Sequence, residues 1–228
     1  MTAAAPIVRR LGRLEYGRAE PMMQTFTAAR TEDTPDEIWL VQHPPVFTLG
    51  RAARLEHVRT PGDIPVVRTE RGGQVTYHGP GQAVCYVLVD LRRAAIRVRD
   101  FVDRLEATTI ALLARYGIDA LRRPGAPGVY VRDDAPSAAG TVVAGPKIAS
   151  LGIRISAGRS WHGVALNVAM DLSPFTRIDP CGYPGLAVTD MRSCLRSMPD
   201  FDEVSARFTA MLAEAFTFHP PSSSSPPR

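Results

Sequence analysis

Lysine is almost absent from this sequence of 228 residues, which contains 26 arginines and a single lysine, Lys147. A surface position that needs only a positive charge accepts either residue. The position that keeps lysine is therefore a candidate for chemistry that arginine cannot perform, because an ammonium group can release its proton and a guanidinium cannot. The alternative is that one lysine persists by chance.

The residues around Lys147 favour a functional role. Gly145 and Pro146 predict a turn, and the largely apolar residues 148–155 that follow predict a buried strand. A lysine at the edge of such a strand is not expected to be simply solvated.

Cysteine is also scarce, with residues at positions 85, 181 and 194 only. This odd number, without any Cys-x-x-Cys pair, predicts free thiols in a reducing cytoplasm. Cys85 lies inside an apolar run and is expected in the core, whereas Cys194 fits either core or surface. The histidines lack metal-ligand spacing, so we expect neither a metal nor a cofactor.

Long hydrophobic runs are missing as well. No apolar stretch reaches 18 residues, and the first residues lack the basic and apolar regions of a signal peptide, so no membrane association is expected. The net charge of +4 weakly suggests an acidic partner. Aromatic residues make up only 7% of the chain, too few between basic residues to indicate a nucleic-acid-binding protein.

The segments that are present predict an α+β fold: a single domain with a mixed, largely antiparallel sheet backed by helices. The catalytic domain is expected over residues 1–218, with a disordered Pro/Ser tail over residues 219–228. We expect helices at residues 21–30, 98–116 and 202–216. Strands are expected at residues 7–16, 37–42, 46–49, 64–69, 75–78, 83–89, 129–131, 141–144, 148–155 and 161–167, with a polar loop at residues 132–140.

Residues 71–82 form the first patch that could carry chemistry, with four glycines around Arg71, Tyr77 and His78. Glycines allow a backbone to approach a ligand, and free N–H groups in such turns bind polar or anionic groups. The patch is neither a dinucleotide fingerprint nor a phosphate-binding loop, since Gly-x-Gly-x-x-Gly and Gly-Lys-Ser/Thr are absent. A purely structural turn remains the alternative.

Three further patches are Lys147 with residues 150–152, residues 160–167 around His162, and residues 179–185 around Cys181. A lone strand histidine is more often hydrogen-bonded than catalytic, and a lone loop cysteine is more often inert. The catalytic interpretation of Cys181 becomes the better one if Lys147 and Cys181 are in contact in the folded protein. The thiolate is the nucleophilic form, and a cation ~4 Å away favours it by up to ~4 kcal/mol at an effective dielectric of ~20.

With these four patches in order, the chain resembles the lipoyl(octanoyl) transferase family, the octanoyltransferases of lipoate biosynthesis. The motifs that carry the resemblance stand intact at residues 71–82, 147–152, 162–168 and 180–182, and the match covers nearly all of residues 7–216. The resemblance implies the fold of the catalytic domain of biotin and lipoate protein ligases. Residues 132–140 and the tail from His219 look like local additions.

The resemblance also implies an activity and its residues. The octanoyl group passes from the thiol of octanoyl-acyl carrier protein to a lysine of lipoyl domains, in 2-oxoacid dehydrogenase complexes or the glycine cleavage H protein. Cys181 would form the thioester and Lys147 would favour its thiolate; we expect a monomer. The acyl site would be lined by Arg71, Gly72, Gly73, Gln74, Val75, Thr76, Tyr77, His78, Ser150, Leu151, Gly152, Gly163, Val164 and Ala165.

Two extensions and three alternatives accompany this interpretation. We hypothesise that Lys147, as free amine, takes the proton of the incoming lysine. Arg71, Arg92, Arg93, Arg97 and Arg99 are candidate docking residues for the acidic carrier protein, although a solvated basic face is the simpler interpretation for each. The alternatives are an ATP-dependent lipoate or biotin ligase of the same fold, a thiol hydrolase pairing Cys181 with His162 or His78, and a non-catalytic acyl-protein binding module.

Overall fold

The computed structural model describes residues 4–133 and 143–218. Within them, seven strands form one sheet in the order β1-β2-β6-β10-β9-β8-β7, and three strands form a second sheet in the order β4-β3-β5. The pairs β1–β2 and β3–β4 are parallel and the other pairs are antiparallel, which confirms a mixed, largely antiparallel architecture. The large sheet comprises β1 (Ile7–Arg13), β2 (Glu37–Gln42), β6 (Gln82–Leu88), β7 (Ala120–Arg122), β8 (Val129–Asp133), β9 (Val143–Ser156) and β10 (Arg159–Asn167). The small sheet comprises β3 (Val46–Leu49), β4 (Val66–Arg68) and β5 (Val75–His78).

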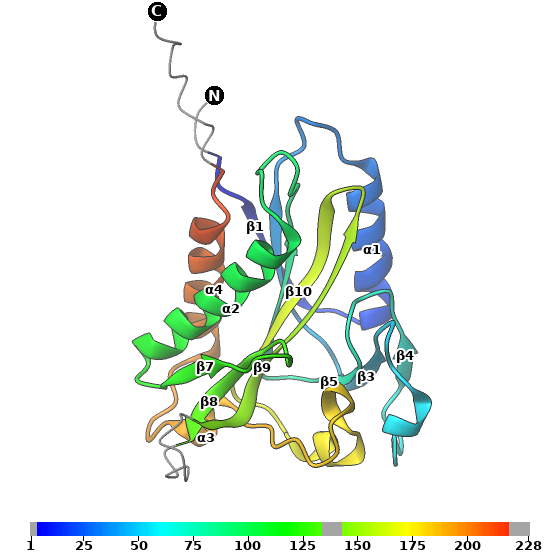
Figure 1. Ribbon diagram of the computed structural model, residues 1–228, viewed down its shortest axis with the longest axis vertical. Helices are drawn as coiled ribbons and strands as arrows, with labels where there is room; N and C mark the ends of the chain where they lie inside the picture. Colours follow the sequence, from blue (N-terminus) through cyan, green and yellow to red (C-terminus); the bar gives the residue numbers. More distant parts are fainter. Residues whose placement is uncertain (1–3, 134–142, 219–228) are drawn as a thin grey trace, which may run out of the picture.

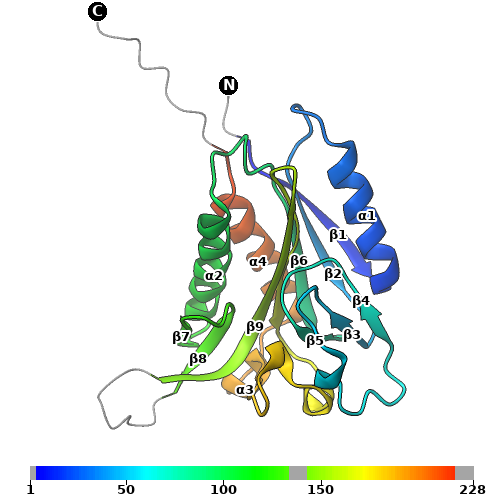
Figure 2. The same ribbon diagram turned by 45° about the vertical axis from the view of Figure 1, so that its right-hand side comes forward.

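Helices cover both faces of the large sheet (Figures 1 and 2). α1 (Tyr16–Ala29) lies on one face, and α2 (Val98–Arg115) and α4 (Phe201–Ala215) lie on the other. The short helix α3 (Met191–Cys194) and three 3₁₀ turns (Leu55–His57, Ser173–Arg177 and Pro180–Gly182) complete the described elements.

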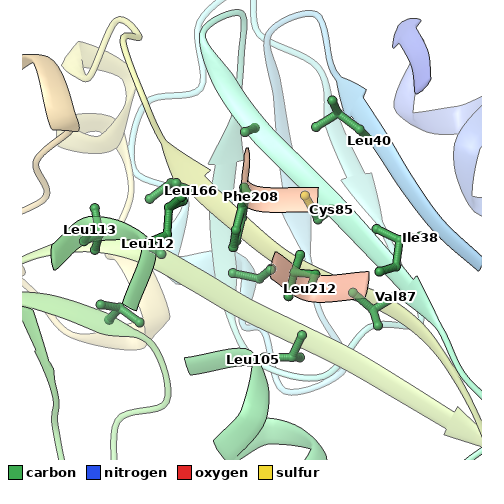
Figure 3. Close-up of a cluster of buried hydrophobic side chains, with 14 of the residues drawn as sticks. Ile38, Leu40, Cys85, Val87, Leu105, Leu112, Leu113, Leu166, Phe208 and Leu212 are labelled. Atoms are coloured by element: carbon green, nitrogen blue, oxygen red, sulfur yellow. The ribbon is translucent and has the colours of Figure 1, made fainter. Parts of the chain in front are cut away.

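The alternation of side chains along β6 shows why the sheet is covered on both sides. Ala83, Cys85 and Val87 pack in the cluster under α2 and α4, whereas the residues between them pack in the cluster under α1. Figure 3 shows the first cluster, in which Leu105 and Leu112 from α2 and Phe208 and Leu212 from α4 meet residues of the sheet. Successive strand residues point to opposite faces, so an unbroken apolar run predicts a strand buried on both faces.

Several features of the secondary structure differ from the sequence prediction. The first helix begins at Tyr16 and not at Pro21, because the buried Tyr16, Ala19 and Met23 recur at helical spacing and the proline removes only one backbone hydrogen bond. The first strand accordingly ends at Arg13. Strand β7 had no counterpart in the prediction.

The expected turn at Gly145 and Pro146 is wrong, because β9 runs through both residues. On β8, Tyr130 pairs with Lys147 and Arg132 pairs with Ala144. Two residues of β9, Gly145 and Pro146, thus stand where β8 has one, and this bulge absorbs the proline without ending the strand. The start of the strand expected at residues 141–144, most of the loop at 132–140 and the tail at 219–228 lie outside the described residues.

Candidate functional site

A cavity of about 400 Å³ lies against the large sheet and extends to the start of β9. Its walls come from α1, from residues 71–78, from β6, β9 and β10, from Val102 of α2, and from the segments that carry Pro127 and Cys181. Fifteen of the sixteen residues predicted for the site line it, which are Lys147, Cys181 and all the predicted substrate-binding residues except Tyr77. The ring of Tyr77 instead packs against Phe47 and Phe175 in the core of the small sheet.

Lys147 and Cys181 meet at this cavity. Nζ of Lys147 donates hydrogen bonds to Sγ of Cys181 at 3.0 Å and to the carbonyl oxygen of Pro127 at 2.9 Å. It also lies 5.3 Å from the centroid of the Tyr130 ring, so the ring face contributes a cation–π contact. Lys147 is only 3% exposed. Among these partners the sulfur is the one that can act as a nucleophile, and it lies in direct hydrogen-bond contact with the ammonium group.

The segment after Cys181 is tied to the strand that carries Lys147. The backbone N–H of Lys147 donates to the carbonyl of Ala187, and the N–H of Thr189 donates to the carbonyl of Lys147, both at 2.9 Å. Val188 thereby pairs with Lys147 as in a parallel strand. This pairing brings together two residues that are 34 positions apart.

The turn Pro180–Gly182 fixes the sulfur from the other side. Cys181 adopts a left-handed backbone conformation with φ of 57°, which is rare for residues other than glycine and is retained only where the surroundings impose it. Asp179, just before it, donates its N–H to the carbonyl of His57 at 2.8 Å and forms an ion pair with Arg59 at 2.6 Å. These contacts fix the position of the turn and, with it, of the Cys181 sulfur.

The glycine-rich loop 71–78 forms the wall opposite β9. Arg71 is 6% exposed, and its guanidinium donates to the carbonyl and hydroxyl of Thr48 and to the carbonyl of Gly72. A Cβ atom on Gly152 would lie 2.9 Å from Cδ of Arg71, so this strand position has no room for a side chain. The N–H of Gly72 donates to the carbonyl of Ile153 at 2.9 Å and ties the loop to β9.

Along the cavity wall, away from Lys147, aromatic and histidine side chains gather: Tyr16, Tyr86, His78 and His162, with His43 behind them. Burial raises the pKa of Tyr16 to about 12 and lowers the pKa of His43 to about 4. Burial also lowers the pKa of His78 and of His162 below the ordinary histidine value. At neutral pH this wall is therefore polar but carries no charge on these groups.

Two of these histidines were considered as a base for Cys181. Nδ1 of His78 bonds Oε1 of Gln82 at 2.7 Å. His162 is 1% exposed, and neither of its ring nitrogens has a hydrogen-bond partner among the described residues, the nearest carboxylate being Glu20 at 3.6 Å. The hydrogen-bond partner that the structure gives to the sulfur is Lys147, so the geometry favours a cysteine–lysine pair over a cysteine–histidine pair.

Sequence reasoning missed several lining residues: Tyr16, Val84, Tyr86, Val102, Tyr183 and the segment 125–127. Except for Tyr183, which lies in the patch around Cys181, none of them stands in a patch with recognisable chemistry, and their contribution follows from the way the fold packs around the cavity. The turn-rich residues 124–128 gave the one available indication, because such a run of Pro, Gly and Ala marks a tight backbone path.

Of the arginines considered for docking, Arg71 lines the cavity but is buried, and the other four do not line it. Arg92, Arg93 and Arg97 belong to the connection from β6 to α2, and Arg99 lies in the first turn of α2. The N–H of Leu91 in this connection donates to the carbonyl of Gly158 in the β9–β10 hairpin. This hairpin is about 30 Å along β9 from Lys147 at ~3.3 Å per residue, and Figures 1 and 2 place it at the opposite end of the molecule from the segment with Pro180–Gly182.

Two features bear on cofactors and membranes. Among the described residues there is no cluster of three or more histidine, cysteine, aspartate or glutamate side chains that could hold a metal ion. Within the same residues, no helix combines the length and the apolar character needed to cross a bilayer.

Comparison with known proteins gives a consistent result. Residues 16–213 match the family model of the lipoyl protein ligase A/B catalytic domain. The octanoyltransferase of Cellvibrio japonicus is 53% identical over 203 residues, covering 89% of each chain. The octanoyltransferase of Ectopseudomonas mendocina is 54% identical over 206 residues, covering 90% of this chain and 95% of its own.

Solved structures show the same fold at much lower identity. A putative lipoate protein ligase from Thermoplasma acidophilum has a TM-score of 0.70 at 15% identity, covering 92% of this chain and 85% of its own. The biotin protein ligase from Aquifex aeolicus has a TM-score of 0.52 at 9% identity, covering 92% of this chain and 70% of its own. These similarities confirm the predicted likeness to the catalytic domain of biotin and lipoate protein ligases.

Proposed function

The chain belongs to the family of lipoyl protein ligase A/B catalytic domains, and on that premise we propose that Cys181 carries an octanoyl group from an acyl carrier protein to a lysine of a lipoyl domain. The chain is an octanoyltransferase, as its curated relatives are, and the transfer serves protein lipoylation. Residues 1–218 act as the catalytic domain of a cytoplasmic monomer.

The observation that carries the proposal is the 3.0 Å contact between Nζ of Lys147 and Sγ of Cys181 at the edge of the cavity. The thiolate of Cys181 attacks the carbonyl carbon of the octanoyl thioester, and the carbon–sulfur bond to the carrier breaks as the new one forms. Lys147 donates a proton to the departing thiolate and is left as a free amine. The exchange of one thioester for another needs little driving force, and the covalent intermediate divides the transfer into two steps.

In the second step the amine of the acceptor lysine attacks the thioester on Cys181. An amide bond forms, the thiolate of Cys181 departs, and Lys147 recovers the proton that the attacking amine loses. The starting charge state of the pair is thereby restored. This cycle requires a cation that can give up a proton, which fits the one position in the chain that holds lysine.

The cavity supports an acyl chain of this kind. Its volume of about 400 Å³ lies within the ~300–1,000 Å³ that ligand pockets span, and Val84, Leu151 and Ala165 supply apolar wall. Each methylene moved from water into such a wall contributes about 0.8 kcal/mol. The substrate-binding role extends over the thirteen predicted residues of the wall, together with Tyr16, Tyr86 and Tyr183.

The experiment that tests this function compares transfer with and without ATP. Purified protein, octanoyl-acyl carrier protein and a lipoyl domain should yield octanoylated domain in the absence of ATP, whereas free octanoate should not react even when ATP is added. Cys181→Ser should abolish transfer and Cys194→Ser, at an exposed thiol, should not. A requirement for ATP would replace the proposal with the ligase alternative.

A further inference from the structure

A single peptide group is held from both of its sides next to the Lys147–Cys181 pair. The carbonyl oxygen of Pro127 accepts the hydrogen bond from Nζ of Lys147 at 2.9 Å. The N–H on the other side of the same amide belongs to Gly128 and donates to Oε1 of Glu106 at 2.8 Å. A carboxylate, an amide and an ammonium group therefore form one continuous chain that ends at the sulfur of Cys181.

Glu106 reaches this amide from the buried face of α2, which lies beside β7 and β8 (Figure 2). The residue is 5% exposed, although its neighbours on that face, such as Phe101 and Leu105, are apolar. Its second oxygen, Oε2, forms an ion pair with Nε of Arg122 on β7 at 3.2 Å. A buried carboxylate is retained only where it is paired and hydrogen-bonded, and these two partners meet that requirement.

We propose that Glu106 is a positioning residue that holds Lys147 against Cys181 by fixing the Pro127–Gly128 amide. The inference rests on the proposed role of the Lys147–Cys181 pair and extends it by one residue, on a helix that carries none of the sequence motifs. Glu106 acts through the amide and through Lys147, without contact to the acyl group.

The conformation of Gly128 explains why the amide needs to be held. Its φ of 139° lies in a region that favours glycine, and a Cβ atom there would lie 2.4 Å from Cε of Lys147. Glycine makes room for the lysine side chain but leaves the peptide free to rotate. The carboxylate removes that freedom, and an amide whose N–H is bonded to an anion also accepts more strongly at its carbonyl.

Removal of Glu106 should therefore weaken one of the anchors of the ammonium. Gly128 would be left with a buried, unpaired N–H, and rotation of the amide would carry the Pro127 carbonyl away from Nζ. The cation would then spend less time at the sulfur, and a smaller fraction of the thiol would be ionised at neutral pH.

The test measures alkylation of Cys181 by iodoacetamide as a function of pH, followed on the peptide that contains Cys181 by mass spectrometry. Glu106→Ala should shift the alkylation profile towards higher pH and slow alkylation several-fold at pH 7. Lys147→Gln removes the cation completely, so the shift of its alkylation profile is the upper limit for the Glu106 variants. The Glu106 variants retain all the other charged and titratable groups near Cys181. These groups are Lys147, Tyr130, Arg123 beyond the Tyr130 ring, Arg71, Asp179 and His57.

Two conservative variants separate positioning from a general contribution to stability. Glu106→Gln keeps an oxygen that can accept from Gly128, so its alkylation profile should remain within about twofold of the wild type at pH 7. Arg122→Gln removes the ion pair but keeps the carboxylate on the amide, and should also leave the profile in place. Glu106→Asp keeps the charge but is one methylene shorter, so it should shift the profile as the alanine variant does.

An unchanged profile in Glu106→Ala or Glu106→Asp, in protein that melts cooperatively, would overturn the proposal. So would an equal shift in Arg122→Gln, which would assign the effect to the ion pair. Because alkylation requires no acyl substrate, the result does not depend on octanoyl transfer. Failure of Cys181 to accept an octanoyl group would refute the proposed function and leave this measurement interpretable.

Discussion

The sole lysine of the chain, Lys147, lies with Nζ 3.0 Å from Sγ of Cys181, across a separation of 34 residues. The contact joins β9 to the turn Pro180–Gly182, and it is supported by the strand-like pairing of Lys147 with Val188. The two residues are thus placed by separate elements of the fold, and backbone pairing ties those elements together.

Replacing Lys147 by arginine should separate the charge of the lysine from its proton. The guanidinium keeps a cation near the sulfur, so octanoyl-enzyme should still form, although more slowly. Transfer to the acceptor should fall by ~100-fold or more, since proton transfer typically contributes ~10²–10⁴-fold. Rapid-quench measurement of acyl-enzyme formation and of its consumption by a lipoyl domain tests this. Consumption at the wild-type rate would remove the base role from Lys147.

The absence of a side chain at Gly163 should be essential for the sheet. A Cβ atom there would lie 2.2 Å from the carbonyl oxygen of Cys85 on β6, so Gly163→Ala should force β10 and β6 apart and reduce the free energy of unfolding by about 1–3 kcal/mol. Gly17→Ala in α1 meets nothing within 4 Å and should be neutral or stabilise the protein. Urea titrations of both variants measure the difference. Equal destabilisation would contradict the predicted clash.

The buried histidines should make stability depend on pH. The pKa of His43 is lowered to about 4 in the folded protein by burial, against about 6.5 in an unfolded chain, so the unfolded state binds more protons between these values. Stability should therefore be fully present above pH 6.5 and fall as the pH drops towards 4, by up to about 3 kcal/mol from this group. His78 and His162 have lowered pKa values and act in the same direction.

Urea midpoints measured between pH 7 and pH 4.5 check this dependence. His43→Gln should flatten the curve, because it removes one titrating group. A slope that is the same in the wild type and in His43→Gln would refute the assignment to His43.

The position of the exposed arginines leads to a prediction about the donor protein. Arg123 lies over the rings of Tyr130 and Tyr183, and both of these rings are near the Lys147–Cys181 pair. If the donor is an acidic carrier protein, Arg123→Glu should raise its KM several-fold, with little change in kcat, and weaken the dependence of KM on salt. Arg97→Glu is the matched control, because Arg97 pairs with Asp100 at the far end of the molecule. Equal effects of the two substitutions would contradict docking at the cavity.

The sequence predicted the architecture well where patterns are local. The apolar run of β6 and the helical spacing of Phe208 and Leu212 in α4 each identify an element without reference to the rest of the chain. Pro21 and Pro146 misled the prediction, because each proline removes one hydrogen bond that the surrounding packing then outweighs. Strand β7, with three residues, is too short to show a period.

The same distinction between local patterns and the rest of the fold applies to the residues of the candidate site. Residues with distinctive chemistry, such as Lys147 and Cys181, stand out in the sequence. Glu106 and Tyr16 do not, because their contribution depends on which backbone group or cavity the fold brings beside them. Tyr77 was predicted to line the site and does not. It lies within a predicted patch, but its place on β5 directs its ring into the core of the small sheet.

The most direct test of the central claim is the mass of the intact protein after incubation with octanoyl-acyl carrier protein alone, followed by peptide mapping. We predict one octanoyl group per chain, attached to Cys181, that disappears when a lipoyl domain is added and is never formed in Cys181→Ala. An octanoyl group found on another residue, or transfer that continues in Cys181→Ala, would contradict the role of this cysteine as the carrier of the acyl group.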